Sequence, residues 1–301
     1  MPKRLIANIR SRIVGEEEPI KLVVSALLAG GHVLLNDVPG VGKTLMAKTL
    51  AQSIAGIFRR IQFSPDLLPG DVTGINTFER KSGEFKFLPG PIFANILLTD
   101  EINRASPRTQ SSLLEAMEEG WVTVDGVPHS LPKPFFVIAT QNPVEFHGTF
   151  PLPEAQLDRF AAFVALGYPK VEEELKLLRG AWATEVSLEP VKAVLGLEEL
   201  SLWQASVRRL PVAPDLQRYI VQVADLSRHH PGISLGISPR GALIWQRMSQ
   251  AHAFVEGRNY VLPEDLKKTA VATLVHRIVS ANRLSKEALI RDMLETVPVP
   301  V

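Results

Sequence analysis

Residues 32–44 read HVLLNDVPGVGKT, and this stretch decides the fold. Its first four residues form a largely apolar run, which is typical of a strand buried on both faces of a sheet. The residues after it place apolar side chains on one face of a helix: Met46, Ala47, Leu50, Ala51 and Ile54. A strand, a glycine-rich loop and a helix in this order form the context in which such a loop binds phosphate groups.

The loop itself offers residue types that hold phosphate. Gly40 and Gly42 allow backbone N–H groups to turn inward, and the N-terminus of the following helix favours negative charge. Lys43 is expected to reach the outer phosphates, and Thr44 to hold magnesium. The predicted cofactor contacts in this segment are Pro39, Gly40, Val41, Gly42, Lys43, Thr44 and Leu45. Asp37 departs from the strict pattern, which has glycine there, but it occupies the least demanding corner of the loop.

Two carboxylates follow a second apolar run, in residues 96–101, ILLTDE. Ligands in parallel α/β sheets bind at the carboxyl ends of the strands. Asp100 is therefore expected to bind the magnesium ion, directly or through its water, and Glu101 to act as general base on the attacking water. Two acids after a strand are ordinarily a solvated loop. The phosphate loop upstream favours the functional interpretation, because the two motifs supply complementary halves of one MgATP site.

Polar residues also follow a third apolar strand, residues 135–139. Asn142 is placed to orient the water or to contact the γ-phosphate. The alternative is a turn-forming asparagine before Pro143, and the sequence leaves both interpretations open.

Two arginines complete the candidate catalytic set. Arg159 lies between apolar neighbours in LDRF, residues 157–160, and an arginine supplied by a neighbouring molecule stabilises a transferred phosphoryl group. Arg240 follows Ser238 and Pro239, which read as an N-cap and a first helical residue. A positive charge in the first helical turn is repelled by the helix dipole, and a bound phosphate would relieve that conflict. Surface salt bridges remain the alternative for both arginines.

Strand and helix patterns alternate to about Phe163, which predicts a parallel sheet between helices. Two hairpins interrupt this pattern, at residues 78–87 and at residues 121–131, where Asp125-Gly126 favours a type I′ turn. Whether the hairpins are working parts or decorative loops stays open. After Pro169 we expect a helical second domain, with helices at about residues 171–184, 197–210, 214–229, 239–255 and 263–282.

Composition restricts the function classes. Lys and Arg number 33 against 32 Asp and Glu, so the sequence disfavours nucleic acid as a partner. The absence of cysteine excludes disulfides, thiolate zinc sites and cysteine nucleophiles. We expect a cytoplasmic protein without a signal peptide or membrane segment, and we interpret residues 22–36 as a helix followed by a strand.

Taken together, these motifs resemble those of the AAA+ superfamily, and their residues resemble those of its MoxR branch. The resemblance covers essentially the whole chain and rests on residues 13–16 (IVGE), 37–44 (DVPGVGKT), 99–105 (TDEINRA), 139–143 (ATQNP), 152–160 (LPEAQLDRF), 236–240 (GISPR) and 276–278 (HRI). An acidic residue at the position of Asp37 is common in MoxR loops.

The resemblance implies an AAA+ nucleotide-binding α/β domain over residues 1–168 and a small all-helical lid over residues 169–301. It implies a helix-2 insert near residues 73–89 and a presensor hairpin near residues 121–131. The implied roles are adenine contacts for Val14 and Gly15, Walker A for Lys43 and Thr44, Walker B for Asp100 and Glu101, sensor 1 for Asn142, arginine finger for Arg159 and sensor 2 for Arg240.

By the same resemblance, the implied activity is MgATP hydrolysis in a ring, expected to be a hexamer. Such a ring would remodel or mature partner proteins, often proteins with von Willebrand factor A domains, in tasks such as metal insertion.

Three other functions stay open. A magnesium-chelatase ATPase subunit shares the inserts and the lid arrangement. A nucleic-acid motor would need basic hairpin tips, whereas residues 121–131 offer only His129 and the other tip sets Arg80 and Lys81 beside Glu79 and Glu84. A non-hydrolysing nucleotide switch is disfavoured by Glu101.

Overall fold

A computed structural model describes residues 2–38, 40–141, 149–178, 190–282 and 284–299. The α/β part contains α1 (Pro2–Arg10), α2 (Glu17–Ala29), β1 (Val33–Asn36), α3 (Lys43–Ser53), β2 (Phe58–Gln62), α4 (Pro69–Thr73), β5 (Ile96–Asp100), η1 (Ile102–Arg104), α5 (Pro107–Glu119), β8 (Phe136–Gln141), α6 (Glu154–Leu157) and β9 (Ala162–Val164). The predicted strands at 32–35, 96–98 and 135–139 correspond to β1, β5 and β8.

The central sheet has the order β2-β5-β8-β1-β9, and all its pairings are parallel. The parallel sheet between helices that the sequence predicts is confirmed. Because all strands run the same way, their carboxyl ends form one edge of the sheet and their amino ends form the opposite edge. The loop after β1 and the acids at the end of β5 therefore lie at the same edge.

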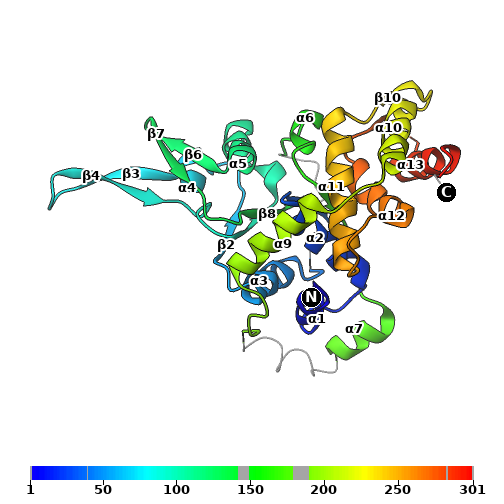
Figure 1. Cartoon of the computed structure of the whole chain (residues 1–301). Helices are drawn as coiled ribbons and strands as arrows, with labels where there is room; N and C mark the ends of the chain where they lie inside the picture. The colour runs from blue at the N-terminus through cyan, green and yellow to red at the C-terminus, as the bar shows by residue number, and fades with distance from the viewer. Residues whose placement is uncertain (1, 39, 142–148, 179–189, 283, 300–301) are drawn as a thin grey trace.

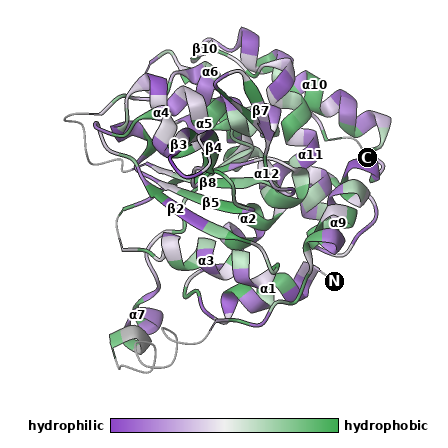
Figure 2. Cartoon of the chain, turned by 90° about the vertical axis from the view of Figure 1, so that its left-hand side faces the viewer, coloured by the Kyte–Doolittle hydropathy of each residue, from purple (hydrophilic) through white to green (hydrophobic). Residues whose placement is uncertain are grey.

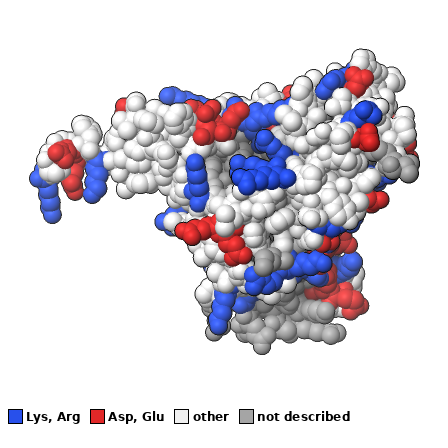
Figure 3. Space-filling view, in the orientation of Figure 1, with Lys and Arg blue, Asp and Glu red and all other residues white. Residues whose placement is uncertain are grey.

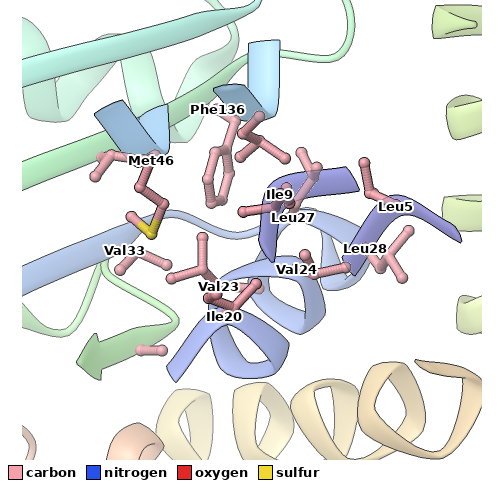
Figure 4. Close-up of a cluster of buried hydrophobic side chains, with 14 of the residues drawn as sticks. Leu5, Ile9, Ile20, Val23, Val24, Leu27, Leu28, Val33, Met46 and Phe136 are labelled. Carbon is pink, nitrogen blue, oxygen red and sulfur yellow. The ribbon is translucent and has the colours of Figure 1, made fainter. Parts of the chain in front are cut away.

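Alternate residues of the strands point to opposite faces, which explains why both faces are covered by helices. On one face, Val33, Ile96 and Phe136 belong to a core shared with α1, α2 and α3, and Figure 4 shows side chains of these elements converging. On the other face, Leu34 and Leu97 pack with residues of η1 and α5. Figure 2 shows the hydrophobic residues concentrated along the central strands.

Two antiparallel hairpins extend from this body. β3 (Gly74–Glu79) pairs with β4 (Glu84–Pro89), and this hairpin projects far from the rest of the molecule (Figure 1). β6 (Trp121–Val124) pairs with β7 (Val127–Ser130). Asp125 and Gly126 both have positive φ, at 49° and 81°, which confirms the predicted type I′ turn.

Helix α5 begins and ends at residues whose types favour helix ends. Ser106 is the N-cap of α5 and accepts a hydrogen bond from the Thr109 N–H, Pro107 is the first helical residue, and Gly120 ends the helix in the left-handed conformation.

The rest of the chain is mainly helical, with α7 (Val171–Leu178), α9 (Leu197–Arg209), α10 (Pro214–His229), β10 (Ile233–Leu235), α11 (Pro239–Val255), α12 (Pro263–Leu274), β11 (Val279–Ser280) and α13 (Lys286–Thr296). The predicted helix over 263–282 is wrong beyond Leu274. There, Val279 and Ser280 pair with β10, a tertiary contact that overrides the local helical pattern. The predicted helix 171–184 is observed to Leu178, and residues 179–184 lie outside the described residues.

The helical part is docked firmly on the α/β part. Met248, Ala251 and Val255 of α11, together with Trp203 of α9, belong to the same buried cluster as α2. A second core fills the helical part and includes Tyr219, Trp245 and Met293. Within the described ranges, no helix has both the length and the apolar character needed to cross a membrane.

Candidate functional site

A pocket of about 420 Å³ opens at the carboxyl edge of the sheet. It is lined by Gly40, Gly42, Lys43, Thr44, Leu45, Arg60, Gln62, Asp100, Glu101 and Thr140. We call it the phosphate pocket. The structure thus brings together the two halves of the predicted site, which lie more than fifty residues apart in the chain.

Glycine is required in the loop for conformational reasons. Gly40 and Gly42 have φ of 89° and 92°, a region that other residues rarely adopt, and a Cβ atom at either position would meet no atom within 4 Å. The loop therefore presents bare backbone to open space, as a phosphate cradle must. Lys43 begins α3, and its Nζ donates to the Asp37 carbonyl oxygen at 2.8 Å.

The structure gives Asp37 a role that its sequence position did not indicate. Its carboxylate is buried and accepts hydrogen bonds from the backbone N–H groups of Leu166, at 2.5 Å, and Gly167, at 3.2 Å. The acidic residue therefore ties the phosphate loop to the segment that follows β9. A glycine here would leave both N–H groups without this acceptor.

The acidic pair occupies the opposite wall of the pocket. Asp100 is buried, accepts from Arg60 Nε at 2.6 Å, and lies 3.3 Å from the Thr140 hydroxyl. Glu101 has a φ of 56°, an uncommon conformation for a residue with a side chain, and such conformations cluster at active sites. Its carboxylate accepts from Gln62 Nε2 at 2.9 Å and from Arg104 Nη1 at 3.0 Å.

Three pocket residues were missing from the predicted set: Arg60, Gln62 and Thr140. Arg60 and Gln62 alternate along β2, and Gln62 pairs in register with Asp100. The polar end of β2 was therefore a usable signal, but only once β2 is known to neighbour β5. Of the predicted contacts, Leu45 lines the pocket, whereas Val14, Gly15 and Val41 are not among its lining residues. Pro39 and Asn142 lie outside the described residues.

The oxygen donors of the pocket suit a magnesium ion. Mg²⁺ is held by one or two protein oxygens together with substrate phosphates and water. The Thr44 hydroxyl and the Asp100 carboxylate both line the pocket and provide this donor set. Arg60, which pairs with Asp100, is about half exposed, so its displacement by a cation costs little.

A second cleft, of about 250 Å³, holds the two predicted arginines. We call it the arginine cleft, and its lining includes Gly30, Gly31, His32, Met117, Glu118, Arg159, Arg240 and Arg247. Glu118 bridges the pair: its Oε2 lies 3.1 Å from Arg159 Nη2, and its Oε1 accepts from Arg240 Nη1 at 3.0 Å. Figure 3 shows basic side chains gathered on this face, between α5 and α11.

The two clefts lie at opposite edges of the sheet. Arg159 comes just before β9, and His32, in the wall of the arginine cleft, comes just before the parallel strand β1. The phosphate loop begins after β1. A strand rises about 3.3 Å per residue, so the five residues from His32 to Asp37 separate the edges by roughly 16 Å. The structure therefore does not bring Arg159 or Arg240 to the phosphate pocket of its own chain.

His32 fixes the base of the arginine cleft. Its Nδ1 accepts from the Val137 N–H at 3.0 Å, which leaves the proton on Nε2 to donate to the Met117 carbonyl oxygen at 3.0 Å. Burial lowers the pKa of this imidazole to about 4, although the bond to Met117 opposes the shift. The neutral ring thus joins the sheet to the end of α5, next to Glu118.

Comparisons with known proteins define the class. Residues 32–162 match the family model for the "ATPase family associated with various cellular activities (AAA)", and residues 225–293 match the AAA lid domain. The chain is therefore a nucleotide-binding domain of the AAA class followed by its lid.

Relatives matched over nearly the whole chain narrow the class. "Chaperone MoxR1" of Mycobacterium tuberculosis is 38% identical over 99% of this chain and 82% of its own length. "Uncharacterized protein YeaC" of Bacillus subtilis is 46% identical, with 99% and 94% covered. A solved crystal structure of a candidate ATPase from Cytophaga hutchinsonii has a TM-score of 0.91 at 35% identity, with 99% and 94% covered. The chain belongs to the MoxR family of AAA+ ATPases.

Proposed function

We propose that this protein binds and hydrolyses MgATP in the phosphate pocket. Lys43 binds the outer phosphates, Thr44 and Asp100 hold the cation, and the Glu101 carboxylate accepts a proton from the attacking water. The magnesium ion, when bound, neutralises phosphate charge. Asn142 is proposed as the residue that orients the water, and Val14 and Gly15 as contacts of the adenine.

The observation that carries the proposal further is the separation of the two clefts. Hydrolysis develops charge on the transferred phosphoryl group, and an arginine there accelerates the reaction by about 10³- to 10⁵-fold. The described lining of the phosphate pocket has Arg60, which pairs with Asp100, whereas Arg159 and Arg240 line the arginine cleft at the other edge. Subunits that place this edge against a neighbour's phosphate pocket complete each site in trans, and repetition of this head-to-tail contact closes a ring. We propose a hexamer.

The client is proposed to be a protein. The relative named as a chaperone supports remodelling or maturation of partner proteins, and the family resemblance adds von Willebrand factor A domain partners, metal-cofactor insertion and a cytoplasmic location. The full-length match to MoxR-named proteins favours this function over a magnesium-chelatase subunit. The domain boundary between residues 168 and 169 stays a prediction.

The hairpins favour a protein client over nucleic acid. His129, the basic candidate of the β6–β7 hairpin, stacks on Phe87 with ring centroids 3.8 Å apart. The β3–β4 hairpin exposes apolar side chains, among them Phe78 and Phe85, and balances Arg80 and Lys81 with Glu79 and Glu84. A surface of this kind offers apolar contact rather than a basic track for phosphates.

Mixing of two variants tests the shared site. Arg159→Ala subunits bind ATP but lack the finger, and Glu101→Gln subunits bind ATP but lack the base. Each alone is expected to release little phosphate. In mixed assemblies an intact finger meets an intact base at some interfaces, so phosphate release should exceed that of both parents. Wild-type activity of Arg159→Ala alone, or no gain on mixing, would overturn the trans-site proposal.

A further inference from the structure

The turn that carries Arg159 is held by an arginine of the lid. Arg277, which follows α12, donates from Nε to the Asp158 carboxylate at 2.7 Å. Its Nη2 donates to the backbone carbonyl of Asp158 at 3.0 Å and to that of Phe160 at 2.6 Å. One guanidinium therefore donates hydrogen bonds to the residues on both sides of Arg159.

Two further lid side chains bind the same turn. His276 Nε2 lies 2.9 Å from the Phe160 carbonyl oxygen, and the Ser238 hydroxyl lies 3.3 Å from the Asp158 carboxylate. Ser238 is the N-cap of α11, two residues before Arg240. We call the turn that carries Arg159 the finger turn. Its contacts with the lid thus come from two separate segments of the lid.

Arg277 also packs against the first turn of α11. A Cβ atom at Gly241 would lie 2.8 Å from Arg277 Cδ, so glycine is needed there for the guanidinium to reach the turn. Gly241 is the residue after Arg240. The Arg277 side chain therefore contacts both the backbone segment that carries Arg159 and the one that carries Arg240.

The position of Arg277 is costly for a charged group. Its side chain is 1% exposed, and burial lowers its pKa to about 10, while Asp158 opposes the shift. A buried ion pair adds little net stability compared with well-packed apolar residues, so it is weak evidence for a purely stabilising role. A rigid planar fork that meets several acceptors at once is, in contrast, suited to fixing geometry.

We propose that Arg277 is a positioning residue that fixes Arg159 and Arg240 as one rigid unit for the neighbouring subunit's nucleotide. The inference rests on the proposed trans site. It assigns a role to the HRI segment at residues 276–278, where the resemblance implied none.

The test is the Arg277→Met variant, which keeps length and apolar volume but donates no hydrogen bond. A misplacement of about 1 Å can cost on the order of 10²-fold in rate, so we expect kcat to fall about 10- to 100-fold while KM for ATP stays within about twofold. Arg277→Lys restores the charge without the fork and should recover only part of kcat. A loss confined to KM, or full recovery with lysine, would overturn the proposal.

Mixing separates a finger defect from a defect of the variant's own pocket. Arg277→Met mixed with Glu101→Gln should gain activity, because Glu101→Gln supplies an intact finger. Arg277→Met mixed with Arg159→Ala should not, because neither subunit supplies one. Gain in the second mixture, or none in the first while Arg159→Ala is rescued, overturns the role of Arg277. Failure of Glu101→Gln to rescue Arg159→Ala itself overturns the trans site instead.

A matched control comes from another ion pair of the lid. Arg258 donates two hydrogen bonds of 2.6 Å to the buried Asp265 and a third to the Tyr260 carbonyl oxygen, so these partners all lie within the lid. Arg258→Met should lower the melting temperature but should not lower the ability of a subunit to activate its neighbour's site. A loss of that ability as large as that of Arg277→Met would overturn the proposal. Where Arg277→Met does not fold, Asp158→Asn carries the same expectations, because it keeps the size of the side chain but removes its charge.

Discussion

The phosphate pocket and the arginine cleft both combine basic and acidic side chains, but in different arrangements. In the phosphate pocket, bare loop backbone and Lys43 face two carboxylates, an arrangement suited to phosphates with a cation. In the arginine cleft, two arginines converge on one carboxylate, Glu118, which leaves an excess of positive charge. The phosphate pocket lacks Arg159 and Arg240, and the arginine cleft lacks the phosphate loop. The difference is one of position: Lys43 and the two carboxylates lie at one edge of the sheet and Arg159 and Arg240 at the opposite edge, which is the basis of the proposed trans site.

The largest expected effects test whether the two regions have separate roles, in nucleotide binding and in turnover. Lys43→Ala should weaken ATP binding by isolated subunits about 10- to 100-fold, since a hydrogen bond to a charged group contributes about 1.5–3 kcal/mol. Arg159→Ala should leave that binding unchanged but lower turnover about 10³-fold or more. Titration with a fluorescent ATP analogue at low protein concentration measures the first, and phosphate release the second. Equal losses of affinity would place both residues in one pocket.

Arg240 sharpens the comparison, because it belongs to the lid but lies beside Arg159. Arg240→Ala should lower kcat about 10- to 100-fold, the value of one charge-assisted hydrogen bond. Mixing with Glu101→Gln should restore activity, because the neighbour then supplies the arginine. If Arg240→Ala shows no gain in that mixture, the residue serves its own pocket.

The bridging carboxylates of the two regions should differ in their effect on stability. Asp37→Ala leaves two partly buried backbone N–H groups without their acceptor, so we expect a loss of about 1–2 kcal/mol in the free energy of unfolding. Glu118→Ala breaks pairs that are partly exposed and should cost less than about 1 kcal/mol. Urea unfolding measures both, and the reverse order would contradict the structure.

The last effect concerns His32 at the base of the arginine cleft and appears only as a change of stability with pH. Its pKa is about 4 in the folded protein against 6.5 in the unfolded chain, so the unfolded chain binds more protons below pH 6.5. The stability that this difference contributes is complete above pH 6.5 and is lost as the pH falls towards 4. From pH 7.5 to 6 the loss is about 1 kcal/mol. His276, whose pKa burial also lowers, titrates in the same direction, so the difference between wild type and His32→Gln isolates His32. Equal pH dependence of the two proteins would contradict this assignment.

Much of the fold could be predicted from local patterns. Strands β1, β5 and β8 follow from their apolar runs, α5 from Ser106, Pro107 and Gly120, and the β6–β7 turn from Asp125-Gly126. The prediction failed after Leu274, where pairing with β10 decides the backbone. It also missed Arg60, because the polar end of β2 becomes a signal only once the strand order is known.

The sequence by itself determined the chemistry of the site, because a phosphate loop needs glycine, lysine and threonine at fixed spacing and these residues are adjacent in the chain. The tertiary structure alone decided where the arginines lie, what Asp37 binds and how Arg277 grips the finger turn. The contacts of Asp37 and Arg277 join residues more than a hundred positions apart, and only the parallel direction of the strands and the docking of the lid bring them together.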